Sequence, residues 1–242
     1  MAHFYLNEEL RDAAIGARVQ LVGAEARHAV TVSRLAVGER AVIGNGAGLV
    51  VEGVITLADH TALEIEVDTV DLAPVPAPAI FLVQALAKGD RDELAVQAAT
   101  ELGADGVVPW SAQRSISRWE GAKIAKGHAR WEAIVREATK QSVRPFLPDV
   151  APLVTTKQLA ALAGQSQMIV LDPTGDRPLT AVDTDGRDVV VVVGPEGGIA
   201  PSELDSLRAG GAVVVRLGST VLRTSTAGPA AIAVLNAKLG RW

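Results

Sequence analysis

The sequence of 242 residues contains no cysteine. It therefore excludes a disulfide framework, a thiol nucleophile and any zinc or iron–sulfur site with cysteine ligands. Histidine is scarce as well, and the four histidines lie far apart in the chain: His3, His28, His60 and His128. Because no two of them have the short spacing of metal ligands, we expect no metal site.

Long hydrophobic runs are also absent. The apolar runs, such as Val189 to Val193, are far shorter than the roughly 20 residues that a membrane-spanning helix needs. Residues Met1 to Leu6 do not show the pattern of a signal peptide, which begins with a basic segment followed by an apolar stretch. We therefore expect a soluble, cytoplasmic protein that does not associate with a membrane.

A general excess of positive charge is missing too, since the net charge is −5. This argues against nonspecific coating of nucleic acid, which is driven by neutralisation of phosphates. One segment differs, because Ser111 to Arg144 contains eight basic and three acidic residues, an excess of five positive charges. Two interpretations remain open for it, an RNA-binding segment and the solvated charged face of a helix.

A change of pattern near residue 72 indicates two domains. Residues 1–72 alternate short β-type runs with glycine-rich turns such as Gly44 to Gly48, and this predicts a small β-rich domain. Residues 73–78 contain three prolines at alternate positions, which is typical of an extended linker. Residues 79–242 form the predicted second domain.

The second domain is predicted to have an α/β fold. The expected strands are residues 79–86, 106–110, 168–171, 188–193 and 213–217. The expected helices are residues 91–102, with Asp90 as N-cap, and residues 123–142, 201–208 and 227–239. Continuous apolar strands separated by helices imply a parallel sheet that is covered on both faces.

Three loops follow the last three predicted strands, and they contain the candidate binding residues. The loops are Leu171-Asp172-Pro173-Thr174-Gly175, Gly194-Pro195-Glu196-Gly197-Gly198 and Leu217 to Thr224. Ligands of open α/β sheets bind beyond the carboxyl ends of the strands. Glycine lets main-chain groups approach a ligand closely, and proline fixes a turn. The loops therefore suit a flat heterocycle that is held by main-chain hydrogen bonds.

The second loop alone also fits a plain turn or a phosphate cradle. It lacks the Gly-Lys-Ser/Thr ending of a P-loop, and the carboxylate of Glu196 would repel a phosphate. The first strand-to-helix turn has no Gly-x-Gly-x-x-Gly motif, which dinucleotide-binding domains show. A negative charge beside main-chain carbonyls favours a cationic ligand such as the sulfonium of S-adenosylmethionine.

The last two loops closely resemble the signature of the RsmE family, the bacterial 16S ribosomal RNA uracil-N3 methyltransferases. The matching stretches are Val193 to Ile199 and Leu217 to Ala227. Shorter matches are Lys88-Gly89-Asp90-Arg91, Ala99 to Gly103, Arg114-Ser115, Arg130-Trp131 and Glu137 to Arg144. In the N-terminal domain, His3-Phe4-Tyr5, His28, Arg34-Leu35 and Gly38-Glu39 resemble the PUA-like RNA-binding domain of the family. The resemblance spans nearly the whole chain.

The resemblance implies a homodimeric enzyme with a small β-barrel-like PUA domain and a C-terminal SPOUT domain that contains a deep trefoil knot. The implied substrate is 16S ribosomal RNA within the small ribosomal subunit. The implied cofactor is S-adenosyl-L-methionine, which residues of the three loops would hold: Leu171 in the first, Gly194, Pro195, Glu196, Gly197 and Gly198 in the second, and Leu217, Gly218, Leu222, Arg223 and Thr224 in the third.

Arg223 is the expected catalytic residue. Methyl transfer to uracil N3 requires alignment of the reacting atoms and loss of the N3 proton, and a cation would stabilise the resulting uridine anion. The residues expected to contact RNA are Arg34, Arg91, Arg114, Arg118, Lys123 and Arg144. Arg91 and Arg144 are the second choices for the catalytic role. For each of the three arginines, Arg223 included, a phosphate contact or a surface ion pair remains an alternative, and for Arg91 and Arg144 that alternative is favoured. Trp119 and Trp131 either stack on RNA bases or pack within the protein, and packing is favoured.

Two positions depart from the pattern of the family. The family usually has Glu at the position of Ser225 and often has Ser at the position of Ala200, so we expect no side-chain cap at residue 200. Two other function classes remain open, a nucleotide-dependent oxidoreductase or NTPase and a noncatalytic RNA-binding module. The missing nucleotide motifs weigh against the first class, and the set of cofactor loops weighs against the second.

Overall fold

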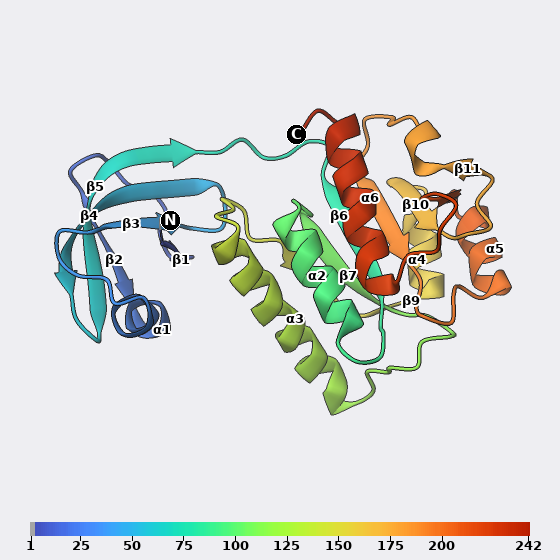
Figure 1. Cartoon of the computed structure of the whole chain (residues 1–242), viewed down its shortest axis with the longest axis horizontal. Coiled ribbons are helices and arrows are strands. Elements are labelled where there is room, and N and C mark those ends of the chain that lie inside the picture. The colour runs from blue at the N-terminus through green and yellow to red at the C-terminus, as the bar shows by residue number, and fades with distance from the viewer. Residues whose placement is uncertain (1–2) are drawn as a thin grey trace. The chain divides into compact units, whose positions relative to one another are not determined.

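A computed structural model of the chain describes residues 3–242, which divide into two compact units (Figure 1). The first unit contains the described residues up to Val75 together with Thr139–Leu147, and the second contains Pro76–Ala138 and Pro148–Trp242. The division at residue 75 falls within the segment expected to be a linker. The sequence had assigned Thr139–Leu147 to the second domain, whereas the structure packs this segment into the first unit.

The first unit is built on a five-stranded sheet with the order β1-β3-β4-β5-β2. Its strands are β1 (Phe4–Leu6), β2 (Arg18–Val22), β3 (Arg40–Gly44), β4 (Leu49–Ala58) and β5 (Ala62–Leu72). β1 and β3 pair in parallel, and the other neighbours are antiparallel. A short helix α1 (Gly23–Arg27) continues into a π-helical turn, His28–Val32.

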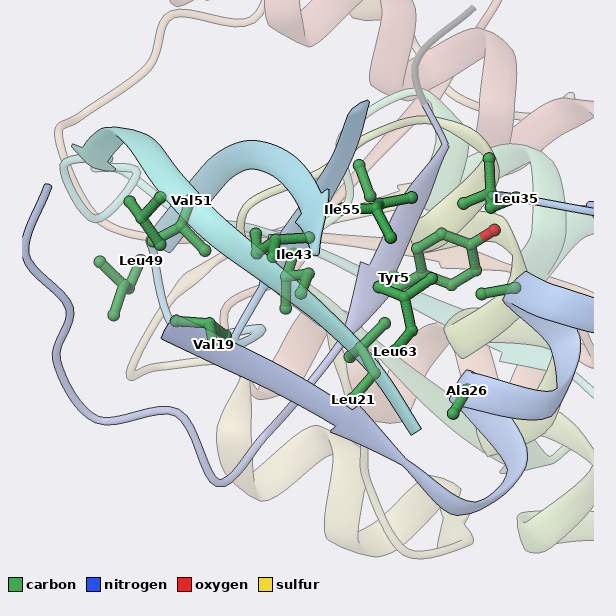
Figure 2. Packing of buried hydrophobic residues seen from close by; sticks show 14 residues of the cluster. Tyr5, Val19, Leu21, Ala26, Leu35, Ile43, Leu49, Val51, Ile55 and Leu63 are labelled. Carbon is green, nitrogen blue, oxygen red and sulfur yellow. The ribbon is translucent and has the colours of Figure 1, made fainter. Parts of the chain in front are cut away.

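Alternation of apolar and polar residues fixes which face of this sheet is buried. In β4, every second residue from Leu49 to Ile55 is buried, as expected for a strand with one covered face. These side chains meet Tyr5, Leu21 and Leu63 in one apolar core, which Figure 2 shows from close by. The predicted β-rich character of residues 1–72 is confirmed.

The segment Thr139–Leu147 is attached to the first unit by packing and by an ion pair. The ring of Phe146 lies so close to Gly48 that a Cβ at position 48 would be 2.9 Å from it. The ammonium of Lys140, with only 9% of its side chain exposed, lies 3.3 Å from a carboxylate oxygen of Glu25. A sequence pattern does not reveal such long-range contacts, which explains why the assignment from sequence differed.

The second unit contains an eight-stranded sheet whose pairings are all parallel. The order is β11-β13-β10-β12-β6-β7-β8, and β9 also pairs with β7. The strands are β6 (Ile80–Ala85), β7 (Gly106–Ser111), β8 (Asp149–Val150), β9 (Val154–Thr155), β10 (Gln167–Leu171), β11 (Arg177–Pro178), β12 (Val189–Val193) and β13 (Val213–Arg216). The predicted parallel sheet is confirmed.

Helices cover both faces of this sheet. They are α2 (Arg91–Glu101), α3 (Ala122–Gln141), α4 (Thr156–Leu162), α5 (Pro201–Ala209) and α6 (Thr224–Lys238), and a 3₁₀ turn spans Leu179–Ala181. α2 and α6 pack side by side (Figure 1), and Leu82 of β6 points to α6, where it meets Gly228. The next residue, Val83, belongs to the core shared with α4 and α5. No helix within residues 3–242 is long and apolar enough to cross a membrane.

The N-cap of α2 and the start of α6 differ from the sequence prediction, whereas the lack of a side-chain cap at residue 200 agrees with it. Asp90 precedes α2 as predicted, but it has φ +58° and its side chain does not cap the helix. At α5, Glu203 accepts a hydrogen bond from the N–H of Ala200 at 3.2 Å, while alanine has no oxygen to cap in return. α6 begins at Thr224, three residues before the predicted Ala227, because the last loop turns into the helix directly after Arg223.

Candidate cofactor site

A pocket of about 310 Å³ lies at the carboxyl ends of β10 and β12. Its walls come from the loops after these two strands, from the segment that leads into α6, and from the first residue of α2. The lining residues are Arg91, Leu171, Asp172, Pro173, Val193, Gly194, Pro195, Glu196, Gly198, Ile199, Val221, Leu222, Arg223, Thr224 and Ala227. This is the edge where ligands of parallel sheets bind.

A smaller hollow of about 130 Å³ shares six of its lining residues with this pocket and adds residues of the loop after β13, among them Leu217 and Gly218. Ten of the eleven residues that the sequence proposed for cofactor binding therefore line one hollow or the other. Gly197 is the exception, because it lines neither. Its carbonyl accepts a hydrogen bond from the guanidinium of Arg114 at 3.2 Å.

Gly194 and Gly198 make the turn of the second loop possible. A Cβ at Gly194 would lie 2.6 Å from the side chain of Ile199, closer than a real Cβ contact allows. Gly198 has φ +71°, a conformation that side chains with a Cβ rarely adopt. The loop that forms one wall of the pocket therefore requires glycine at both positions.

Thr224, the first residue of α6, connects two walls of the pocket. Its hydroxyl donates a hydrogen bond to the carbonyl of Gly194 at 2.8 Å and accepts one from the amide of Gln84, also at 2.8 Å. Gln84 is fully buried in β6 and donates a second hydrogen bond to the carbonyl of Ala85. The hydrogen bonds of these buried groups hold the second and third loops together.

Glu196 is held by an ion pair at the mouth of the pocket. One carboxylate oxygen accepts hydrogen bonds from the guanidinium of Arg91 at 2.9 Å and from the N–H of Lys88 at 3.0 Å. Partial burial by itself would raise the pKa of the Glu196 carboxyl. The backbone N–H groups of Glu196 and Lys88 and the guanidinium of Arg91 stabilise the carboxylate more strongly, so the pKa is lowered from its ordinary value of 4.5. The charge expected to attract a cationic ligand is thus already paired with Arg91.

Arg223 lies at the N-cap position of α6 with an exposed side chain. Its carbonyl accepts hydrogen bonds from Thr226 and Ala227, which fixes the backbone. Among the residues that the structure describes, its guanidinium has no hydrogen-bond or ion-pair partner. The side chain lines the pocket and is therefore available to a bound molecule.

The expected RNA-contacting residues are divided between the two units. Arg91 and Arg114 both touch the second loop, through Glu196 and Gly197. Arg118 lies in the same β7–α3 connection as Arg114, and Lys123 lies in the first turn of α3. The remaining two belong to the first unit, where Arg34 is exposed with φ +58° and Arg144 follows the end of α3.

Sequence reasoning missed several residues of the pocket. Val193, Ile199, Val221 and Ala227 give it apolar walls, but apolar residues next to glycine carry no distinct signal. Gln84 was missed although a glutamine inside an apolar strand is unusual and was visible in the sequence. Within residues 3–242, no group of three or more histidine and acidic side chains is arranged to hold a metal ion.

Comparison with known proteins identifies both units. Residues 74–236 match the model of an RNA methyltransferase domain, and residues 21–68 match that of an RNA methyltransferase PUA domain. The chain is 39% identical over 233 residues to ribosomal RNA small subunit methyltransferase E of Mycobacterium bovis, covering 94% of this chain and 89% of that protein. The identity and coverage are the same for the protein of that name from Mycobacterium tuberculosis.

The fold agrees with these matches. A crystal structure of ribosomal RNA small subunit methyltransferase E from Neisseria gonorrhoeae, bound to S-adenosyl methionine, has a TM-score of 0.88 with 27% sequence identity and covers 98% of both chains. The family models, the sequence identity and the fold thus support the same assignment. The chain belongs to the ribosomal RNA small subunit methyltransferase E family.

Proposed function

We propose that this protein transfers a methyl group from S-adenosylmethionine to N3 of a specific uridine in 16S ribosomal RNA. The observation that carries the proposal is the pocket at the sheet edge, which is lined by the three candidate loops, two of which resemble the family signature. The relatives named above act on ribosomal RNA of the small subunit, and the Neisseria protein binds S-adenosyl methionine. An RNA substrate of this kind implies that the enzyme works in the cytoplasm.

The lining of the pocket fits S-adenosylmethionine. Leu171, Ile199 and Leu222 offer apolar surface to the adenosine ring system, and the glycine-rich loops offer main-chain donors and acceptors to its polar edges. The volume of about 310 Å³ lies at the lower end of the range for small-molecule pockets, and the adjoining hollow extends the space. When bound, the cofactor supplies a methyl group on a positively charged sulfur.

The protein side chains contribute positioning and electrostatic stabilisation. Thr224 and Glu196 fix the loops, so that little ordering is required when the cofactor binds. The unpaired guanidinium of Arg223 stabilises the negative charge that develops on uracil when N3 loses its proton. The apolar walls exclude water, which strengthens this electrostatic effect.

We further propose that the second unit contains the trefoil knot of the SPOUT fold and that the protein works as a homodimer. The knot is supported by the resemblance of the second and third loops to the family signature. The homodimer is supported by the family resemblance, and light scattering of the purified protein at micromolar concentration would test it. A mass that corresponds to a single chain of 25.1 kDa would contradict the dimer.

The central experiment is to map methylated uridines in small-subunit RNA by mass spectrometry. RNA from a strain that lacks this protein is expected to lose one N3-methyluridine, and complementation with the gene is expected to restore it. Unchanged N3-methyluridine would contradict the substrate assignment. Calorimetric titration with S-adenosylmethionine, ATP and NAD tests the cofactor separately, and binding of ATP or NAD alone would contradict the methyltransferase.

A further inference from the structure

A second hollow of about 310 Å³ in the same unit has no role in the reaction proposed above. It lies between the Ala87–Glu93 segment and the first half of α3, and we call it the tryptophan pocket. Its lining includes Lys88, Asp92, Glu93, Trp119, Gly127 and Arg130. The hollow combines an aromatic ring with charged groups of both signs, which is a surface suited to a polar, flat ligand.

The indole of Trp119 is held in place by its neighbours. Its ring meets the buried ring of Trp131 edge to face, with the ring centroids 5.4 Å apart. On another side it rests on the backbone of α3 at Gly127, where an added Cβ would lie 2.3 Å from the ring. A ring fixed in this way loses little freedom when a ligand stacks on it. The contacts therefore give a rigid stacking platform that lines an open hollow.

The polar groups of the tryptophan pocket favour a nucleobase over a phosphate. Asp92 is buried, and its two carboxylate oxygens accept hydrogen bonds from the N–H groups of Ala87 and Glu93. Glu93 accepts two hydrogen bonds from Arg130 with the same oxygen, at 3.0 and 2.9 Å. These carboxylates offer no hydrogen-bond donor to a phosphate, whereas their oxygens accept the N–H groups of a base edge.

The surroundings fit an RNA strand that leads into the hollow. Lys88 lines the hollow, and Lys123 and Lys126 are exposed on the first half of α3. Cations around an aromatic platform are the usual arrangement for single-stranded RNA, in which bases stack on the ring and phosphates meet the cations. The volume accommodates one nucleotide, so an unstacked base fits and a helical stem does not.

One hydrogen bond joins the lining of the tryptophan pocket to the lining of the cofactor pocket. Lys88 lines the former and Glu196 lines the latter, and the N–H of Lys88 donates to the carboxylate of Glu196. The two pockets have no lining residue in common, and the methylated base itself belongs in the one that holds the cofactor. A base in the tryptophan pocket is then a neighbour of the target in the same strand.

We propose that the tryptophan pocket binds one unstacked nucleobase that flanks the target uridine, with the base stacked on Trp119. This rests on the proposed function in that RNA is taken as the substrate. The pocket thereby selects the sequence or loop structure around the target, because only RNA with a free base beside the target fills both pockets. The enzyme recognises its site through two bases rather than one.

The first test compares the kinetics of Trp119→Ala, Trp119→Phe and Gly127→Ala with those of the wild type. Loss of the stacking ring in Trp119→Ala is expected to raise KM for small-subunit RNA about tenfold to a hundredfold. Trp119→Phe keeps an aromatic face and is expected to remain within about threefold of the wild type. Gly127→Ala adds a methyl group behind the indole, displaces it and is expected to raise KM as well. The Kd for S-adenosylmethionine, measured in all variants, should stay unchanged.

The second test is photo-cross-linking, which requires no turnover. RNA fragments with 5-iodouridine at single positions beside the target are irradiated with the intact protein, and the adduct is located by peptide mapping. An adduct on Trp119 at one flanking position is the expected result. A wild-type KM in Trp119→Ala, or adducts only elsewhere, would overturn the proposal. Failure of the wild-type enzyme to methylate uridine would instead contradict the proposed function, and the cross-link would still decide about the tryptophan pocket.

Discussion

Arg223 differs from the other arginines of the site in having its charge uncommitted. Arg91 is paired with Glu196 and Arg114 is bonded to the carbonyl of Gly197, whereas the guanidinium of Arg223 lines the pocket with no partner among residues 3–242. A charge that is not yet neutralised stabilises a developing anion more strongly than one already paired. This contrast favours Arg223 as the residue that stabilises the uridine anion.

Replacing Arg223 with alanine is expected to lower kcat by about a hundredfold, because the developing uridine anion loses its stabilising cation. Single-turnover methylation of small-subunit RNA measures the effect. Arg223→Lys keeps a positive charge and should recover part of the rate. Calorimetry with S-adenosylmethionine checks that the pocket is intact. An alanine variant with full turnover and normal ligand binding would remove Arg223 from the mechanism.

The lowered pKa of Glu196 predicts how the free energy of unfolding depends on pH. Its pKa is lowered in the folded protein, so its ionised form stabilises the fold above about pH 4.5, and this contribution disappears as the pH falls through the lowered pKa. The free energy of unfolding of wild type should therefore exceed that of Glu196→Gln by about 0.5–1 kcal/mol at neutral pH. The difference should shrink below pH 4.5. Urea titrations at several pH values measure it.

A matched control for Glu196→Gln is Glu64→Gln in the first unit. Glu64 also pairs with an arginine, Arg18, and the two glutamates are similarly exposed, at 20% and 21% of the side chain. Glu196→Gln is expected to weaken S-adenosylmethionine binding severalfold because the second loop loses its anchor, and Glu64→Gln should leave it unchanged. Equal effects of the two substitutions would show that the ion pair at the pocket has no special role.

The backbone is strained directly after the C-terminal end of α3. The helix ends in a Schellman motif, in which the N–H of Arg144 bonds to the carbonyl of Thr139 and the N–H of Val143 bonds to that of Lys140. This motif needs a left-handed residue after the helix, which is usually glycine. Here it is Val143, with φ +56° and a side chain that is 47% exposed. A β-branched residue is unfavourable in this conformation.

Val143→Gly is therefore expected to stabilise the protein by about 1 kcal/mol, since glycine removes the clash of the Cβ with the backbone. The midpoint of thermal unfolding should rise by a few degrees. Val143→Ala keeps the left-handed strain but removes the branched methyl groups, so its gain should be smaller. A Val143→Gly variant that unfolds at a lower temperature than the wild type would mean that the valine side chain makes a contact that outweighs the strain.

The sequence predicted elements better than it predicted their long-range contacts. The parallel strands and their helices follow from local pattern, since apolar runs of the right length separate helical repeats. The loops were located for the same reason. The ion pair of Arg91 with Glu196 joins residues more than a hundred positions apart, and so does the hydrogen bond from Gln84 to Thr224. No local sequence pattern encodes such contacts. The same limit applies to the packing of Thr139–Leu147 into the first unit.

For the whole molecule, the structure changes the meaning of the basic segment Ser111 to Arg144. Some of its charges are neutralised within the chain, because Arg130 pairs with Glu93 and Lys140 pairs with Glu25. The free positive charge of the segment is therefore smaller than its sequence indicates. Arg118 and Lys123 remain exposed in the second unit, and no described residue forms an ion pair with either. They are the best candidates for contacts with phosphates.

The affinity for RNA should accordingly fall as the salt concentration rises. The double variant Arg118→Ala/Lys123→Ala should reduce the slope of log Kd against the logarithm of the salt concentration by about two. Fluorescence anisotropy with a labelled RNA fragment at several salt concentrations measures the slope. Arg114 is left intact because it also holds Gly197. Lys157→Ala on α4, another exposed lysine, serves as the control and should change little. An unchanged slope in the double variant would exclude these residues from phosphate binding.

The hydrogen bond between Gln84 and Thr224 also has a consequence for the order of folding. It joins residues 140 positions apart, and the strands beside it pair in parallel, so it forms only after very long loops have closed. Contacts of this kind develop slowly and late. Helical signal should therefore return early during refolding, and the ability to bind S-adenosylmethionine should return last. The cofactor then cannot guide the chain to its fold, but it stabilises the fold once the chain has reached it.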